Sequence, residues 1–140
     1  MSAAPEPADV PAHFQTFLAF DYGLKRTGVA SGNRMLRTAT PQRTIRAEGA
    51  EARLAEVEAR VREWQPDALV VGVPFHPDGA PHENTVRAQK FARQLRGRFG
   101  LPVYEVDERY STTEALSGGA RDADAAAACI ILEQFLRSLK

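Results

Sequence analysis

In the segment DALVVGVP (67–74), an aspartate is followed by a continuous run of apolar and β-branched residues that stops at a proline. A run of this length is typical of a strand that is buried on both faces, as in the middle of a parallel sheet. Neighbouring parallel strands need long crossover connections, which are usually helices. The run therefore favours an α/β fold in which helices pack on the sheet.

Three segments have the apolar spacing of amphipathic helices, and their expected limits are residues 49–64, 84–99 and 122–139. The expected inward residues are Leu54, Val57, Val61 and Trp64 in the first helix, Ala88, Phe91, Ala92, Leu95 and Phe99 in the second, and Ala128, Ile131, Leu132, Phe135 and Leu139 in the third. Proline follows the first helix, and a glycine followed by a proline closes the second.

Four more strands are expected, within residues 14–23, 27–36, 40–45 and 102–108. The short connection DYGLKR between the first two indicates an antiparallel hairpin. Three strands are thus followed by alternating helices and strands. This order predicts a mixed five-stranded sheet, with its first three strands antiparallel and with helices packed on both faces.

The overall composition limits the kind of protein. The net charge is zero, with 18 basic and 18 acidic residues, which argues against nucleic-acid binding through bulk positive charge but leaves room for a local patch. A single cysteine, Cys129, excludes an internal disulfide and a cysteine-based zinc site. No apolar run approaches the roughly 20 residues that span a bilayer. We expect a cytoplasmic protein that binds no membrane, with residues 1–13 as a disordered tail and residues 14–140 as a single domain.

Acidic residues stand at the carboxyl ends of two expected strands, where ligands gather in open α/β sheets. Asp21 ends the first strand, and Asp107 and Glu108 end the last. Because neighbouring residues of a strand point to opposite faces, only one of Asp107 and Glu108 can join Asp21. A turn aspartate is the alternative explanation for Asp21.

A third acid, Asp124, lies in the first turn of the last expected helix, on the same stripe as Ala128 and Ile131. An inward carboxylate is costly to bury without a partner, and the helix N-terminus offsets only part of that cost. A hard divalent cation, Mg²⁺ or Mn²⁺, would offset the rest and would let several carboxylates converge. The simpler alternative is that Asp124 caps the helix.

Several motifs, in order, resemble those of the YqgF (RuvX-like) family of candidate pre-16S rRNA nucleases and candidate Holliday junction resolvases. They are FLAFDYGLKRTGVASG, ALVVGVPFHPDG, VRAQKFARQL, VDERYSTTEA and DADAAAACIILEQFL, which together span roughly residues 16–139. The resemblance implies a single ribonuclease H-like nuclease domain that hydrolyses phosphodiester bonds of structured nucleic acid with two metal ions. The chain departs from the family in the short, glycine-rich LSGGARDA segment and in the FHPDG loop.

The resemblance also implies roles for particular residues. Asp21, Glu108 and Asp124 would be the catalytic acids and would hold Mg²⁺ or Mn²⁺. The expected nucleic-acid contacts are Lys25, Arg26, Arg109, Ser111, Thr112 and Thr113. A structural salt bridge to Asp107 or Glu105 is the alternative for Arg109.

Two substrates fit the resemblance. Processing of the 5′ end of pre-16S rRNA is the first hypothesis, and resolution of four-way DNA junctions is the second. Junction resolution would favour a symmetric homodimer that presents two sites. The alternative function is a catalytically silent nucleic-acid or ribosome-binding module. Arg87, Lys90 and Arg93 recur every three positions on the second helix and form either an electrostatic footprint or an ordinary solvated face.

Overall fold

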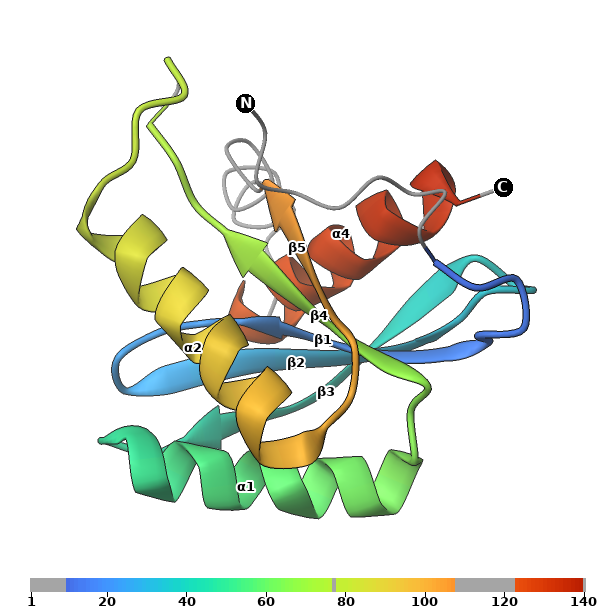
Figure 1. The fold of residues 1–140 in the computed structure, drawn as a ribbon, viewed down its shortest axis with the longest axis horizontal. Helices are drawn as coiled ribbons and strands as arrows, with labels where there is room; N and C mark the ends of the chain where they lie inside the picture. Colours follow the sequence, from blue (N-terminus) through green and yellow to red (C-terminus); the bar gives the residue numbers. More distant parts are fainter. Residues whose placement is uncertain (1–9, 77, 108–122, 140) are drawn as a thin grey trace.

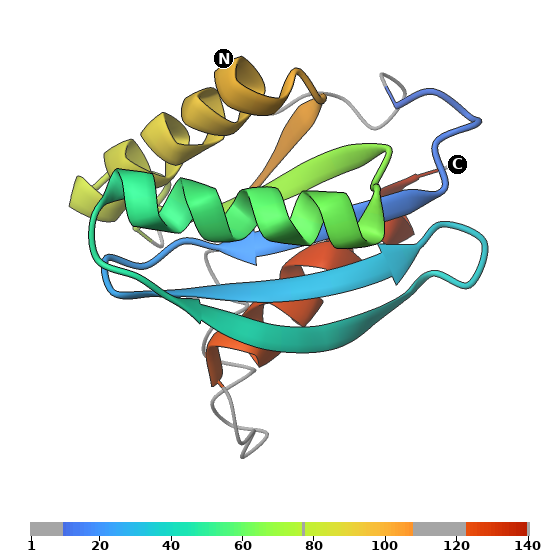
Figure 2. The ribbon, with the colours of Figure 1, turned by 90° about the horizontal axis from the view of Figure 1, so that it is seen from below.

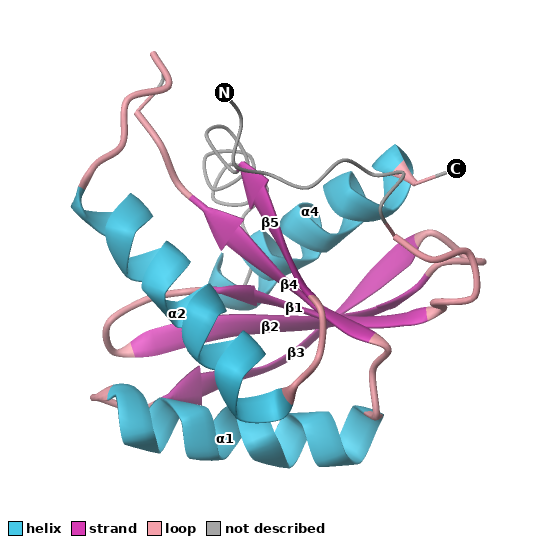
Figure 3. Ribbon diagram, in the orientation of Figure 1, coloured by secondary structure: helices cyan, strands magenta, loops and turns pink. Residues whose placement is uncertain are grey.

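The computed structural model describes residues 10–76, 78–107 and 123–139. Its strands are β1 (Thr16–Asp21), β2 (Arg26–Asn33), β3 (Thr38–Arg46), β4 (Ala68–Val73) and β5 (Val103–Asp107). Its helices are α1 (Ala50–Trp64), α2 (Glu83–Phe99) and α4 (Ala123–Ser138). The order of elements expected from the sequence is confirmed. Figure 3 distinguishes the helices from the strands by colour. No helix among the described residues combines the length and the apolar character needed to cross a membrane.

The five strands form one mixed sheet in the order β3-β2-β1-β4-β5. β1 pairs antiparallel with β2, and β2 pairs antiparallel with β3. β4 pairs parallel with both β1 and β5. The apolar run that predicted a central parallel strand is β4, in which all six residues are buried. The carboxyl ends of β1, β4 and β5 therefore meet at one edge of the sheet.

Helices cover both faces of the sheet (Figures 1 and 2). Phe17 and Ala19 of β1 belong to the core cluster that includes α4, whereas Leu18 and Phe20 belong to the cluster that includes α1 and α2. This alternation follows from the two-residue period of a strand. By the same period, Asp21 lies on the α4 face.

The expected inward stripe of α1 is wrong at its end. Trp64 is 40% exposed, whereas the side chains of Arg53 and Arg60 are buried beside those of Leu54 and Val57. Trp64 is the last residue of the helix, just before the chain turns to enter β4. Long arginine side chains can pack their aliphatic stems against the apolar core in its place.

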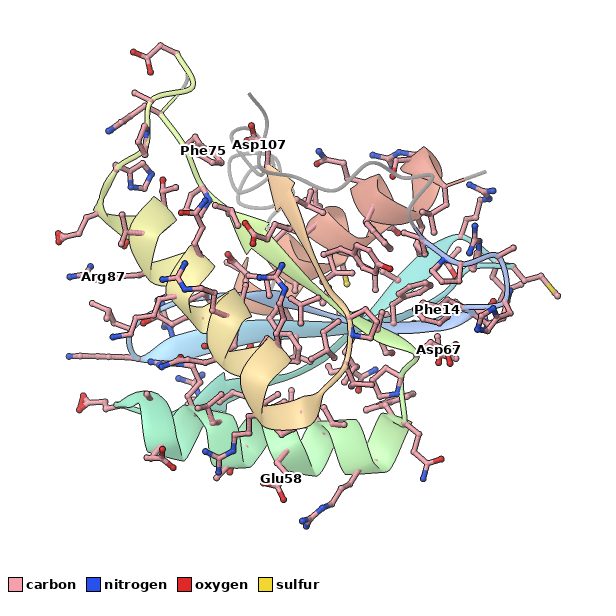
Figure 4. The ribbon with its side chains drawn as sticks, viewed as in Figure 1. Phe14, Glu58, Asp67, Phe75, Arg87 and Asp107 are labelled. Carbon is pink, nitrogen blue, oxygen red and sulfur yellow. The ribbon has the colours of Figure 1, made fainter. Side chains whose placement is uncertain are left out.

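Asp67 (Figure 4) ties the amino ends of β1 and β4 together. Asp21 lies at the opposite edge of the sheet, where these two parallel strands end. One oxygen of the Asp67 carboxylate accepts hydrogen bonds from the main-chain N–H of Gln15 at 2.7 Å and of Thr16 at 3.0 Å. Nearby, Val10 is only 5% exposed and packs into the α4 core cluster, although it lies in the segment expected to be a tail.

Candidate metal and nucleic-acid site

Asp21 is the last residue of β1, and a glycine lies opposite it on each of the two adjacent strands. Asp21 pairs with Gly28 on β2 and with Gly72 on β4. Residues that are directly opposite each other in a sheet project from the same face. Neither of these two partners therefore places a side chain beside Asp21 on the α4 face.

The first turn of α4 packs directly on Gly28. A β-carbon at Gly28 would overlap the main-chain carbonyl of Asp124 and would lie 3.1 Å from the main-chain nitrogen of Ala125. The side chain of Asp124 is 28% exposed. The structure therefore brings Asp124 next to the cross-strand partner of Asp21, so two of the three expected acids come from adjacent elements on one face.

The two basic residues expected to contact nucleic acid follow Asp21 closely. The Nε of Arg26 lies 3.1 Å from a carboxylate oxygen of Asp124, and the Nζ of Lys25 lies 4.0 Å from a carboxylate oxygen of Glu48. Both basic side chains are more than half exposed. They therefore remain accessible to a phosphate while they balance acidic charge at this edge.

Asp107 ends β5 (Figure 4). Because β4 runs parallel to both β1 and β5, Asp107 lies at the same edge as Asp21, but on the other face. Tyr104 and Val106 pack in the α4 cluster, whereas Val103 packs in the cluster that includes α2. Glu105 has the same parity as Asp107 and pairs with Arg96 of α2 at 3.2 Å. The alternation of side chains along β5 thus places Asp107 on the α2 face of the sheet, whereas Asp21 lies on the α4 face.

The remaining expected site residues, Glu108, Arg109, Ser111, Thr112 and Thr113, lie outside the described residues. Within the described part of the chain, there is no group of three or more His, Cys, Asp or Glu side chains that could hold a metal ion. Two of the three expected ligands, Asp21 and Asp124, belong to that part. Their oxygen atoms suit a hard divalent cation, and a third carboxylate would complete the set.

Sequence reasoning missed the role of Arg53, which holds the connection between β1 and β2. Its Nη2 donates to the main-chain carbonyl of Leu24 at 2.7 Å, and its guanidinium lies 4.7 Å from the centre of the Tyr22 ring. Arg53 therefore fixes the segment that carries Asp21, Lys25 and Arg26. Its position next to Leu54 was the only signal in the sequence, and an exposed arginine would give the same pattern.

His82 caps α2, a role that hydrophobic spacing does not indicate. Its Nδ1 accepts a hydrogen bond from the main-chain N–H of Asn84 at 3.1 Å. The hydroxyl of Thr85 accepts one from the main-chain N–H of His82 at 3.0 Å. This reciprocal pair is a capping box with histidine in the place where serine or threonine is usual.

Two solved structures share this architecture. RuvC of T. thermophilus, solved with a Holliday junction substrate, aligns with a TM-score of 0.53 and 16% identity over 87% of this chain and 93% of that one. The Fowlpox virus resolvase, solved with Holliday junction DNA, aligns with a TM-score of 0.59 and 9% identity over 88% of this chain and 97% of that one. The fold is therefore ribonuclease H-like, as the sequence resemblance implied.

The sequence itself places the chain more narrowly. The RuvX family, described as Holliday junction resolvase, matches residues 15–138. A protein of Polaromonas sp. (strain JS666) is 75% identical over 139 residues, which cover 99% of both chains. A protein of Albidiferax ferrireducens is 72% identical, over 98% of this chain and 88% of its own. Both are named as candidate pre-16S rRNA nucleases. The chain belongs to the RuvX family of nucleases.

Proposed function

We propose that this protein is a metal-dependent endonuclease that cuts structured nucleic acid at the α4 side of the carboxyl edge of its sheet. The observation that carries the proposal is the placement of Asp21 and Asp124 next to the same residue, Gly28, which pairs with Asp21 and packs against the main chain of Asp124. Two carboxylates on one face, with exposed cations beside them, suit a phosphodiester and its counter-ions.

Asp21 and Asp124 would hold Mg²⁺ or Mn²⁺ together with a third carboxylate, for which we propose Glu108. The alternation along β5 supports Glu108 over Asp107, because a residue that follows Asp107 in the same extended conformation would return to the α4 face. A pair of divalent ions would supply an activated water and charge stabilisation at the leaving oxygen.

The chain's own residues would bind and orient the substrate. Lys25 and Arg26 offer exposed positive charge next to the acids, which suits contact with the scissile or a neighbouring phosphate. The family resemblance assigns Arg109, Ser111, Thr112 and Thr113 to the same task. Arg53 would keep Lys25 and Arg26 in place through its hydrogen bond to the β1–β2 connection.

For the substrate we propose the 5′ end of pre-16S rRNA, which the names of the two highly identical relatives support. The description of the family favours a second candidate, the Holliday junction, for which a symmetric homodimer would present two sites. Either substrate would be met in the cytoplasm, which is where we place the protein.

The decisive experiment is a side-by-side digestion of a precursor rRNA fragment and a synthetic four-way junction, with mapped cut sites. With Mg²⁺ or Mn²⁺ the wild-type protein should cut one of them, and Asp21→Asn should stop cleavage without unfolding the protein. Asp78→Asn, an identical change in the β4–α2 loop, should leave cleavage unchanged. Cleavage in the presence of chelator, or by Asp21→Asn, would refute the metal-carboxylate site. Binding without cleavage under every ion condition would instead identify a silent binding module.

A further inference from the structure

A second candidate site lies on the face of the sheet opposite α4. A cleft of about 260 Å³ opens between the β1–β2 connection, the first turn of α1 and the amino-terminal half of α2. Its lining includes Tyr22, Gly49, Ala50, Arg53, Arg87 and Lys90. Three of these residues are cationic, and none is acidic. The cleft is several times larger than the volume of about 30 Å³ that one water molecule occupies in the liquid.

Arg53 is the buried member of this set. It is 4% exposed, its Nε has no hydrogen-bond partner, and it forms no ion pair with any residue in the described ranges. A buried guanidinium without an anionic partner is costly, because its charge is removed from water without compensation. One carbonyl bond and the Tyr22 ring offset part of this cost. An anion in the cleft would offset more.

The rest of the lining adds positive potential. Lys90 forms no ion pair within the described part of the chain, and Arg87 pairs with the exposed Glu83 of its own helix at 3.0 Å. Figure 4 shows Arg87 extending outward from α2. Gly49 is the N-cap of the 15-residue α1 and supplies no side-chain cap, so the first-turn N–H groups have no such partner.

We propose that this cleft binds a phosphate of the nucleic-acid backbone other than the one that is cut. The inference rests on the proposed function, because it assumes that nucleic acid crosses the carboxyl edge of the sheet. Tyr22 follows Asp21 directly, so the two side chains mark the cleft face and the α4 face of the same strand end. A strand that crosses this edge can place one phosphate at Asp21 and another between Arg53 and Lys90.

Binding in chelator tests the cleft without any need for cleavage. The affinity of the precursor rRNA fragment and of the four-way junction should be measured for wild type and Lys90→Ala over a range of salt concentrations. Lys90→Ala should weaken binding several-fold and make the slope of log affinity against log salt shallower by about 0.7–0.9, the value for one phosphate contact. Arg62→Ala, an exposed cation in the last turn of α1, is the matched control and should change neither quantity.

Inorganic phosphate provides a second probe. In a wild-type titration followed by NMR, the amide signals of Gly49 and Ala50 should shift, and in Lys90→Ala the same shifts should require more phosphate. Phosphate shifts combined with an unchanged nucleic-acid slope would overturn the proposal and assign the cleft to a small phosphorylated molecule.

Failure of the cleft and failure of the nuclease give different results. Equal nucleic-acid affinity of wild type, Lys90→Ala and Arg62→Ala would refute phosphate binding in the cleft. It would not bear on the proposed metal-carboxylate site. A shallower salt dependence of nucleic-acid affinity in Lys90→Ala, together with no cleavage by the wild-type protein under any ion condition, would support phosphate binding in the cleft. The same result would refute the proposed nuclease activity. Arg53 is left unchanged in these tests because its burial makes loss of folding the expected result of its removal.

Discussion

Gly28 and Asp124 lie so close together that the main chain of Asp124 occupies the space where any other residue at position 28 would carry a β-carbon. Gly28 pairs with Asp21 across the β1–β2 ladder. The glycine is therefore the spacer that sets how near the amino end of α4 can approach the end of β1. Asp21 and Asp124 can lie close together because Gly28 has no β-carbon.

Gly28→Ala should displace the first turn of α4, because the obstacle is main chain rather than a flexible side chain. We expect a loss of about 1–3 kcal/mol in the free energy of unfolding, which is typical of overpacking. We also expect a loss of roughly 100-fold in metal-dependent cleavage, since a shift of about 1 Å is enough to cause it. Denaturant unfolding and cleavage assays measure the two effects.

The matched control is Gly97→Ala in α2, where a β-carbon meets nothing within 4 Å. That change should raise the free energy of unfolding by roughly 0.5–1 kcal/mol and leave cleavage unaltered, because alanine is favoured over glycine within a helix. If Gly28→Ala retained full stability and activity, the close packing of α4 on β2 would not position Asp124.

The contrast between β4 and α1 shows what the sequence could reveal about the fold. The run from Ala68 to Val73 is buried on both faces, so its composition alone indicates a central strand. α1 buries Arg53 and leaves Trp64 40% exposed, the reverse of what hydrophobicity suggests. Hydrophobic spacing identifies a helix and its approximate face, but it does not show which long polar side chains find partners beneath it.

The candidate site was predictable to a similar extent. Strand periodicity is enough to place Asp21 on the face shared with Phe17 and Ala19, because that face depends only on neighbours along the chain. The role of Gly28 is not visible in the sequence, since it depends on a contact with Asp124, 96 positions away. The partnership of Arg53 with Leu24 has the same origin, because it is a contact between α1 and the β1–β2 connection, which are separated along the chain by β2 and β3.

Substitutions of Asp107 and Glu108 should have very different effects on metal-dependent cleavage. Asp107→Asn should leave metal-dependent cleavage within a few-fold of wild type, because alternation along β5 places Asp107 on the face opposite Asp21. Glu108→Gln should abolish cleavage if Glu108 completes the ligand set. Each variant controls for the other, since they are adjacent and lose the same charge. The reverse result in cleavage assays would make Asp107 the ligand and would require the end of β5 to twist.

Asp67 should make stability depend on acidic pH. Hydrogen bonds from the main-chain N–H groups of Gln15 and Thr16 lower the pKa of its carboxyl below the ordinary 3.8. A lowered pKa means that the folded state favours the ionised form, so this contribution is complete above pH 3.8 and is lost as the pH falls below it. Asp67→Asn should unfold more easily by about 1 kcal/mol at neutral pH and should lose less stability on acidification.

Urea denaturation at a series of pH values measures this effect of Asp67. Identical pH dependence in wild type and Asp67→Asn would show that the link between the amino ends of β1 and β4 does not stabilise the ionised carboxylate.

Arg26 should compete with divalent cations for Asp124. Its Nε lies 3.1 Å from the Asp124 carboxylate, and its side chain is 58% exposed, so the pair should contribute less than about 1 kcal/mol to folding. Arg26→Ala should therefore leave the free energy of unfolding nearly unchanged and tighten Mn²⁺ binding in the absence of nucleic acid, because the positive charge beside the ligand is gone. Nucleic-acid affinity should fall at the same time, since a phosphate contact is lost.

Arg62→Ala, which breaks the pair with Glu58 on α1, is the control and should alter neither the Mn²⁺ affinity nor the nucleic-acid affinity. Weaker Mn²⁺ binding by Arg26→Ala in calorimetric titrations would mean that Arg26 orients Asp124 for the cation instead of competing with it.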